Sequence, residues 1–600
     1  MAKQLSEIRF EICFSLPVCR LWFVANTTSY HAQFRVCSFC LFSYSTIFIR
    51  SILFMKLLYI LIALCSILSC NTKARVDLIV HNAVVYTVDS NFAIAEALSI
   101  NDGKIVATGS NANILNRYIS DNITDAHGKS IYPGFIDAHA HFYGYALSLQ
   151  EVDLTGTKSW DECIERVKNF VKTKSIQPDQ WIIGRGWDQN DWLDKYFPVK
   201  DRLDEIFPGN PILLSRIDGH AAITNQVALN KAGVQPGDTI TGGLVEVNKG
   251  GLTGILIDNA INRVSNIIPE PGMPFLKIAF KQAEDNCFAS GLTTIVDCGL
   301  LRRQVNQIDT LQRSGTLRMK LVALLSDTPE NYDHYLREGP YKTDRLNVNG
   351  FKLYADGALG SRGACLLQPY HDKPGWNGFL LSNADHYEQA LKKIYNSSFQ
   401  ACTHAIGDSA NRTILKLYAG ILKNKNDRRW RIEHAQVIDS NDFKWFGRYS
   451  IIPSVQPTHA TSDMYWAADR LGGERIKGAY AYRQLLQQND WVALGTDFPV
   501  EDISPFKTFY AAVVRKDAQH FPPDGFQIEN ALTKEEALKG MTIWAAKGSF
   551  EEKEKGSLEK SKWADFIITD IDIMRCDPSD ILKTKVQYTY VNGEKVYERE

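Results

Sequence analysis

The 600-residue sequence predicts an α/β fold built on a (β/α)8 TIM barrel, because strand-like apolar runs alternate with helical stretches. We assign the barrel to residues 131–555. Its eight candidate strands are residues 134–141, 293–297, 320–324, 350–354, 399–404, 429–434, 451–455 and 492–497. The span from about 142 to 290 is too long for one strand-to-helix connection, so we expect an inserted subdomain there.

Short alternating runs near both ends of the chain predict an accessory β-sandwich made of residues 76–130 and 556–600. The triplet Asn101-Asp102-Gly103 and the pair Asn592-Gly593 are hairpin-turn signals, one in each segment. Two β segments at opposite ends of the sequence suit a single domain that both termini close.

The composition favours a small-molecule substrate. Hydrophobic residues make up 45% of the chain, which is ample for a globular core. Because 67 Lys and Arg residues balance 68 Asp and Glu residues, there is no electrostatic case for nucleic acid. The protein partner that we consider is a second copy of the same chain, in a homodimer.

The N-terminus resembles a bacterial secretion signal, which predicts a location in the cell envelope. We expect residues 1–54 to be a leader that does not fold. Residues 55–70 begin with Met55-Lys56, continue with a short apolar core and end in Ile67-Leu-Ser-Cys70, as in a lipoprotein signal peptide. By that resemblance Cys70 is lipidated, and the protein is lipid-anchored at a membrane or periplasmic. The alternatives are an uncleaved anchor and a misassigned leader.

A set of metal-ligand residues follows the predicted strands in order. His139 and His141 lie two apart on one strand, so both rings face the same way. The remaining members fall at or near the ends of later strands, and barrel enzymes assemble their sites at that face. They are Lys352, His404, His434 and Asp497. Four histidines and a carboxylate suit Zn²⁺ or a similar divalent ion.

With these motifs the chain resembles the amidohydrolase superfamily, and is most similar to its YtcJ-like branch, which includes N-substituted formamide deformylases. The resemblance covers about residues 76–597. It is carried by the run from Pro133 to His141, Asp218-Gly-His220, Lys352, Asp356-Gly357, His404, His434, Asp497 and Ala564-Asp565.

The resemblance implies a metal-dependent hydrolase with one or two divalent ions. By position, His139, His141, His404 and His434 would bind metal, and Asp497 would act as both ligand and base. Lys352 would be a bridging lysine, carboxylated on its amine, if two ions are present. From the residues alone Lys352 has three alternatives: it is carboxylated, neutral or outside the ligand set, since an ammonium cannot bind a cation.

Three further residues are candidates for substrate contacts. His220 is a candidate hydrogen-bond donor to the substrate or its oxyanion, although a loop-ordering role is equally open. Arg362 is a candidate to hold an acidic group of the substrate, and His459 follows a predicted strand and is expected to line the pocket. Glu433 is expected to point away from the site, because it alternates with His434 along the strand.

We therefore expect a hydrolase of a non-peptide carbon–nitrogen bond, a linear amide such as an N-substituted formamide or N-acyl amine. A bound divalent ion lowers the pKa of its water toward about 7, giving a metal hydroxide that attacks the carbonyl. Asp497 would take up the water proton and return it to the leaving amine. The alternatives are hydrolysis of a cyclic amide, carbamate or ester at the same site, and a non-catalytic binding lipoprotein.

Overall fold

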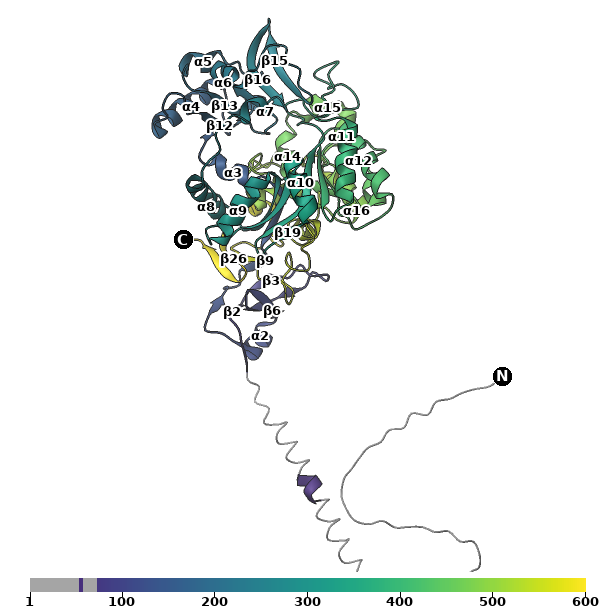
Figure 1. Ribbon diagram of the computed structural model, residues 1–600. Coiled ribbons are helices and arrows are strands. Elements are labelled where there is room, and N and C mark those ends of the chain that lie inside the picture. Colours follow the sequence, from purple (N-terminus) through teal and green to yellow (C-terminus); the bar gives the residue numbers. More distant parts are fainter. Residues whose placement is uncertain (1–52, 58–72) are drawn as a thin grey trace, which may run out of the picture. The chain divides into compact units, whose positions relative to one another are not determined.

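The computed structural model describes residues 53–57 and 73–600, and residues 73–600 form one compact unit (Figure 1). Residues 1–52 and 58–72 lie outside the described residues, and with them most of the predicted leader and signal peptide and the predicted lipidation site Cys70. No helix within the described ranges is both long and apolar enough to cross a membrane.

The predicted barrel is present, and its eight parallel strands coincide with the eight predicted runs. Their order around the sheet follows the order of the chain, as in a TIM barrel. The strands are β10 (Phe135–Ala140), β17 (Leu292–Leu300), β18 (Lys320–Ser326), β20 (Leu346–Tyr354), β21 (Gln400–Ala405), β22 (Arg431–His434), β23 (Ile452–Val455) and β24 (Ala493–Leu494). The short β19 (Tyr341–Lys342) pairs antiparallel with β20 at one edge.

Helices follow the barrel strands and bury an apolar face against them. In α12 (Asp408–Leu422), for example, Ile414, Leu415 and Tyr418 are buried while the opposite face is open to solvent. The other helices are α3 (Phe142–Ser148), α8 (Met273–Ala289), α9 (Arg302–Arg313), α10 (Pro329–Glu338), α11 (Ala384–Tyr395), α13 (Lys444–Tyr449), α14 (Pro457–Asp463), α15 (Ala467–Arg475), α16 (Tyr482–Asn489), α17 (Pro505–Val514), α18 (Lys534–Gly540) and α19 (Ile543–Gly548).

The barrel closes where β10 meets the segment that follows β24. Asp137 accepts hydrogen bonds from the Thr496 backbone N–H at 3.0 Å and from its hydroxyl at 2.6 Å. The Asp497 N–H then donates to the His139 carbonyl at 2.8 Å. Gly495 permits this approach, since a Cβ there would lie 2.5 Å from the His139 nitrogen. The seam therefore brings the first and last strands, and their polar residues, side by side.

The inserted subdomain lies between α3 and α8 and contains its own sheet, in the order β11-β12-β13-β14-β16-β15 (Figure 1). A separate apolar cluster that includes Trp187, Ile212 and Ile255 fills its core. Its elements are β11 (Val152–Asp153), α4 (Trp160–Lys174), β12 (Ile182–Trp187), α5 (Asp201–Ile206), β13 (Ile212–Arg216), β14 (Ala221–Thr224), α6 (Gln226–Ala232), β15 (Gly243–Asn248), β16 (Gly251–Asp258) and α7 (Asn262–Ser265).

Strands from both ends of the chain form two further sheets, in the orders β6-β5-β2-β8 and β27-β26-β25-β9-β3-β4. Leu98, Ile131 and Phe566 share one apolar cluster, so side chains from both sheets pack together, as the predicted sandwich requires. The strands are β2 (Leu78–His81), β3 (Val84–Tyr86), β4 (Ile94–Ala95), β5 (Ala97–Asn101), β6 (Lys104–Gly109), β8 (Ile123–Asp125), β9 (Ser130–Pro133), β25 (Phe566–Thr569), β26 (Val586–Val591) and β27 (Glu594–Glu598).

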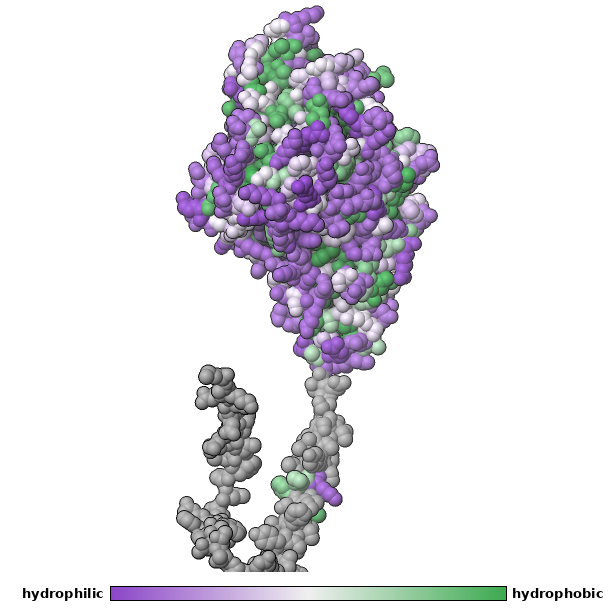
Figure 2. All heavy atoms as spheres, turned by 90° about the vertical axis from the view of Figure 1, so that its right-hand side faces the viewer, coloured by the Kyte–Doolittle hydropathy of each residue, from purple (hydrophilic) through white to green (hydrophobic). Residues whose placement is uncertain are grey.

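A short helix and a strand pair complete this region. Helix α2 (Asn111–Arg117) follows β6, and β1 (Ala74–Arg75) pairs with β7 (Tyr118–Ile119). On the face in Figure 2, hydrophilic residues cover most of the surface and hydrophobic ones lie in small groups between them. That distribution is normal for a globular protein.

Candidate metal centre and substrate pocket

The six residues predicted to form the metal site meet at one mouth of the barrel. His139 lies near the end of β10 with His141 just after it, and Asp497 lies three residues beyond β24. Candidate ligand atoms of His139, His434 and Asp497 all lie within 4.8 Å of one another. Asp497 Oδ1 also lies 3.1 Å from His141 Nε2. The ring of His404 is centred 4.5 Å from that of His434, so the predicted histidines form one group.

Hydrogen bonds through Nδ1 hold three of these imidazoles in place. Each Nδ1 faces an acceptor of the protein, which fixes the ring and leaves Nε2 as the nitrogen that can bind a metal. The pairs are His139 with Glu433 Oε2 at 2.6 Å, His141 with the Cys298 carbonyl at 3.0 Å, and His434 with Gln456 Oε1 at 2.8 Å. Oriented rings of this kind are typical of metal-binding histidines.

Glu433 is a site residue for which the sequence-based expectation was wrong. It points into the barrel toward His139, is fully buried, and forms an ion pair with Arg431 at 2.6 Å. Alternation holds as far as Glu433, but His434 has a left-handed backbone with φ of 72°. That turn brings the His434 ring over the barrel mouth, although it follows an inward-facing neighbour. The two adjacent side chains therefore reach the same site.

Burial sets the protonation of the histidines. Burial, followed by the nearby charge of Lys352, lowers the pKa of His139 to about 4. Burial and neighbouring imidazoles lower the pKa of His404 and of His434 well below the usual value. These three rings are therefore neutral near pH 7, and the neutral imidazole is the form that binds a metal.

The donor set fits a divalent ion of the Zn²⁺ type. Nitrogen and carboxylate ligands of this number suit Zn²⁺. The buried Nε2 of His404 has no hydrogen-bond partner among the described residues, which is costly unless another group binds it. Lys352 Nζ lies 3.2 Å from His139 Nε2, so as an ammonium it donates to that nitrogen and is not itself a ligand.

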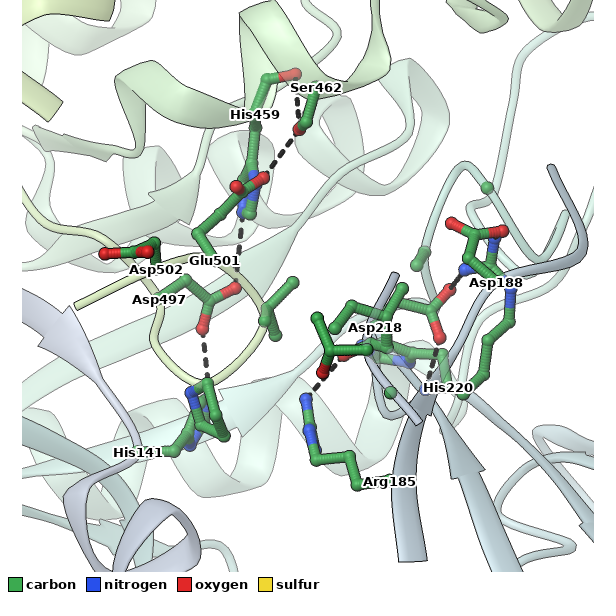
Figure 3. Close-up of a pocket in the computed structure, with 18 of the residues that line it drawn as sticks. His141, Arg185, Asp188, Asp218, His220, His459, Ser462, Asp497, Glu501 and Asp502 are labelled. Carbon is green, nitrogen blue, oxygen red and sulfur yellow. Dashed lines mark hydrogen bonds and ion pairs between the residues drawn. The ribbon is translucent and has the colours of Figure 1, made fainter. Parts of the chain in front are cut away.

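Five of the six candidate metal ligands, all but His139, line a cavity of about 760 Å³ to which both the barrel and the inserted subdomain contribute (Figure 3). His220 lines the cavity, and its Nδ1 lies 2.6 Å from Asp258 Oδ1. Gly357 makes room for that carboxylate, since a Cβ there would lie 2.5 Å from it. The hydrogen bond to Asp258 raises the pKa of His220 against the opposite effect of burial. His220 therefore presents its other N–H as a donor.

His459 lies beside Asp497, as its predicted place in the pocket requires. Its Nε2 is 3.3 Å from Asp497 Oδ2 and its Nδ1 is 3.0 Å from Glu501 Oε1, while Ser462 donates to the same Glu501 oxygen. Burial alone would raise the pKa of Asp497, but its contacts with the His141 and His459 rings hold it well below its usual range. The carboxylate is therefore ionised at neutral pH.

Arg362 does not lie among the residues that line the cavity. It has a left-handed backbone with φ of 61°, and its guanidinium pairs with Asp372 at 2.7 Å. The predicted contact of Arg362 with the substrate is therefore not supported by its position. The arginines that line the cavity come from the inserted subdomain instead, namely Arg185 and Arg216.

Sequence reasoning missed the residues that orient the histidines. Glu501 lies four positions after Asp497, so its nearness in the sequence was a usable signal. Asp258 gave no such signal, because β14 and β16 of the inserted sheet bring it to His220 across 38 positions. Arg185 lies in β12 with nothing in the surrounding sequence to mark it.

Comparison with known proteins gives matches over most of the chain. The model of a family described as the amidohydrolase family matches residues 122–597. The chain is 32% identical to the protein LONG AFTER FAR-RED 3 of Arabidopsis thaliana, over 87% of this chain and 91% of that one. It is 29% identical to YtcJ of Bacillus subtilis, over 86% of this chain and 99% of that one.

More distant relatives include an enzyme and solved structures. The chain is 25% identical to the N-substituted formamide deformylase of Arthrobacter pascens, over 87% of this chain and 98% of the deformylase. A crystal structure of an uncharacterized metal-dependent hydrolase from Pyrococcus furiosus matches with a TM-score of 0.66 and 28% identity. That match covers 83% of this chain and all of the other.

The contact between Glu433 and His139 predicts an effect on metal affinity. We expect Glu433→Gln to weaken zinc binding about 10- to 100-fold, because the neutral amide orients and polarises the imidazole less well. Competition with a chromogenic chelator measures this affinity. Thermal melting separates it from a folding defect, and the exposed Glu474→Gln on α15 is the control. Unchanged affinity in Glu433→Gln would show that the carboxylate does not support the metal site.

Proposed function

Since the chain belongs to the amidohydrolase family, we propose that it hydrolyses a linear amide, an N-substituted formamide or N-acyl amine, with the aid of zinc. The observation that carries the proposal is the buried group of His139, His434 and Asp497, of which His434 and Asp497 line a cavity large enough for a small molecule. The relationship to a formamide deformylase supports this choice of bond.

His139, His141, His404 and His434 would hold the divalent ion together with Asp497. When bound, such an ion lowers the pKa of its water and polarises the carbonyl of the substrate. Carboxylation of the Lys352 amine would convert that residue from a hydrogen-bond donor into a ligand that could bridge two ions.

The remaining roles follow from where the side chains lie. Asp497 is ionised and buried, so it can take a proton from the attacking water and pass it to the leaving amine. His459 donates to the second oxygen of Asp497 and fixes the direction of the carboxylate. Across the cavity, His220 is placed to donate to the carbonyl oxygen as negative charge develops on it (Figure 3).

We also propose that the chain is a lipoprotein of the bacterial cell envelope. The support is the sequence of residues 55–70, where a positive start and an apolar core precede Cys70. A lipid on Cys70 would hold the enzyme at a membrane surface. For the oligomeric state, we propose a homodimer. Light scattering of the purified protein would measure its mass and test this.

The role of Asp497 predicts separate effects on turnover and on metal content. We expect Asp497→Asn to lower kcat for N-phenethylformamide about 100- to 10,000-fold, because no base remains to accept the water proton. Zinc should remain bound through the histidines. Amine release and elemental analysis are the measurements, and the exposed Asp385→Asn on α11 is the control. Activity retained by Asp497→Asn would exclude the proposed proton transfer. A wild-type enzyme that cleaves esters but no amide would exclude the proposed substrate.

The lipoprotein proposal predicts labelling at one cysteine. When the chain is expressed in a bacterial host with radioactive palmitate, we expect the label in the wild type and in Cys65→Ala but not in Cys70→Ala, because Cys70 ends the signal peptide. Gel autoradiography of the membrane fraction measures the label on the protein. Label in Cys70→Ala, or none in the wild type, would contradict a lipid at this position.

A further inference from the structure

Arg185 is a cation of the cavity that the proposed reaction does not use. It lies in β12 of the inserted subdomain and lines the cavity. One guanidinium nitrogen donates to the Ile217 carbonyl at 2.5 Å, and this bond holds the side chain in place. Its Nε is buried and has no hydrogen-bond partner among the described residues. The side chain is therefore anchored at one end while donors remain unused.

Most other cations that line the cavity are already neutralised. Arg216 forms ion pairs with Asp188 and Asp218, and Lys507 pairs with Asp502 at 2.6 Å. Lys352 lies in the metal centre. Arg185, in contrast, has no carboxylate of the described residues within 4.0 Å of its guanidinium nitrogens. Arginine is always charged, and this guanidinium has no direct ion pair among the described residues, since Asp497, Asp218 and Glu151 act on its charge only from a longer distance.

The place of Arg185 in the cavity suits a contact with bound substrate. Figure 3 shows Arg185 with Asp218 and His220 on one side of the cavity, and His141 and Asp497 on the other. A substrate whose amide lies between His220 and the metal residues would therefore pass close to the guanidinium. Nearby apolar side chains, including Leu149, Ile217 and Trp466, line the same cavity and can hold an apolar group.

We propose that Arg185 binds a carboxylate of the substrate, so that the preferred substrates are N-formyl or N-acyl amino acids with an apolar side chain. A guanidinium forms two parallel hydrogen bonds with a carboxylate, which matches the unused donors of Arg185. The neighbouring Glu151 is the rival partner, since it also lines the cavity. If the Glu151 carboxylate pairs with the Arg185 guanidinium, a carboxylate on the substrate finds no free donor and does not increase the affinity. This proposal rests on the amide hydrolysis proposed above and narrows it.

The test compares two substrates that differ in one charge. We would measure kcat/KM of the zinc-loaded full-length enzyme for N-formylphenylalanine and for its neutral amide, N-formylphenylalaninamide, each as both enantiomers. We expect the acid to be preferred about 10- to 100-fold, mainly through KM, since hydrogen bonds to charged groups are worth that factor. In Arg185→Gln the ratio should fall to about 1, and Arg185→Lys should retain part of it.

The control is Arg202→Gln, which removes an arginine of the same subdomain that pairs with Asp161 and does not line the cavity. It should keep the wild-type ratio. Equal use of acid and amide by the wild type would overturn the proposal, and so would an unchanged ratio in Arg185→Gln.

A binding experiment separates this proposal from the proposed reaction. If the wild type hydrolyses neither compound nor N-phenethylformamide, the proposed reaction fails. The affinities of zinc-stripped protein for the acid and the amide, measured by ligand-detected NMR, then decide the role of Arg185. Tighter binding of the acid that disappears in Arg185→Gln supports the proposal. Equal binding, or no binding of the acid, overturns it.

Discussion

The seam between the first and last barrel strands is the constraint on which the site depends. Asp137 accepts two hydrogen bonds from Thr496, and the next residue, Asp497, donates its N–H to the carbonyl of His139. These bonds place the carboxylate beside the histidines that begin the site. Residues about 360 positions apart in sequence thus become neighbours through two bonds to the Asp137 carboxylate and one bond between backbone groups. The ligand geometry is therefore built into barrel closure.

Around that seam, buried carboxylates hold the histidines in place on two sides, one inside the barrel and one at the cavity. Burial keeps His139, His404 and His434 neutral, and the ionised Glu433 fixes His139 through its Nδ1. Arg431 neutralises Glu433, so a buried carboxylate costs less than it would alone. On the cavity side, His459 and His220 are each held by a carboxylate of their own, Glu501 and Asp258. The barrel supplies the candidate metal ligands, and residues of the inserted subdomain line the same cavity.

The sequence was sufficient for the barrel and for the grouping of the candidate metal ligands, but not for the residues that orient them. Apolar runs that alternate with helical stretches mark barrel strands directly, so all eight strands were predictable. The orientation of Glu433 was not, because alternation assumes an extended backbone and His434 adopts a left-handed one. Arg185 and Asp258 come from the inserted sheet, whose pairing no local pattern specifies. Arg362 is the opposite case. Its sequence context suggested a contact with the substrate, but the side chain lies outside the cavity and pairs with Asp372.

We infer that His139, His434 and Asp497 hold a divalent ion at the barrel mouth. Anomalous diffraction at the zinc edge, from crystals grown with zinc, tests it most directly. The structure predicts a peak about 2.0–2.2 Å from the nitrogen of each histidine and from a carboxylate oxygen of Asp497. A second peak beside Lys352 and His404 would mean two ions. No peak among these residues, with the protein folded and zinc present, would contradict the account.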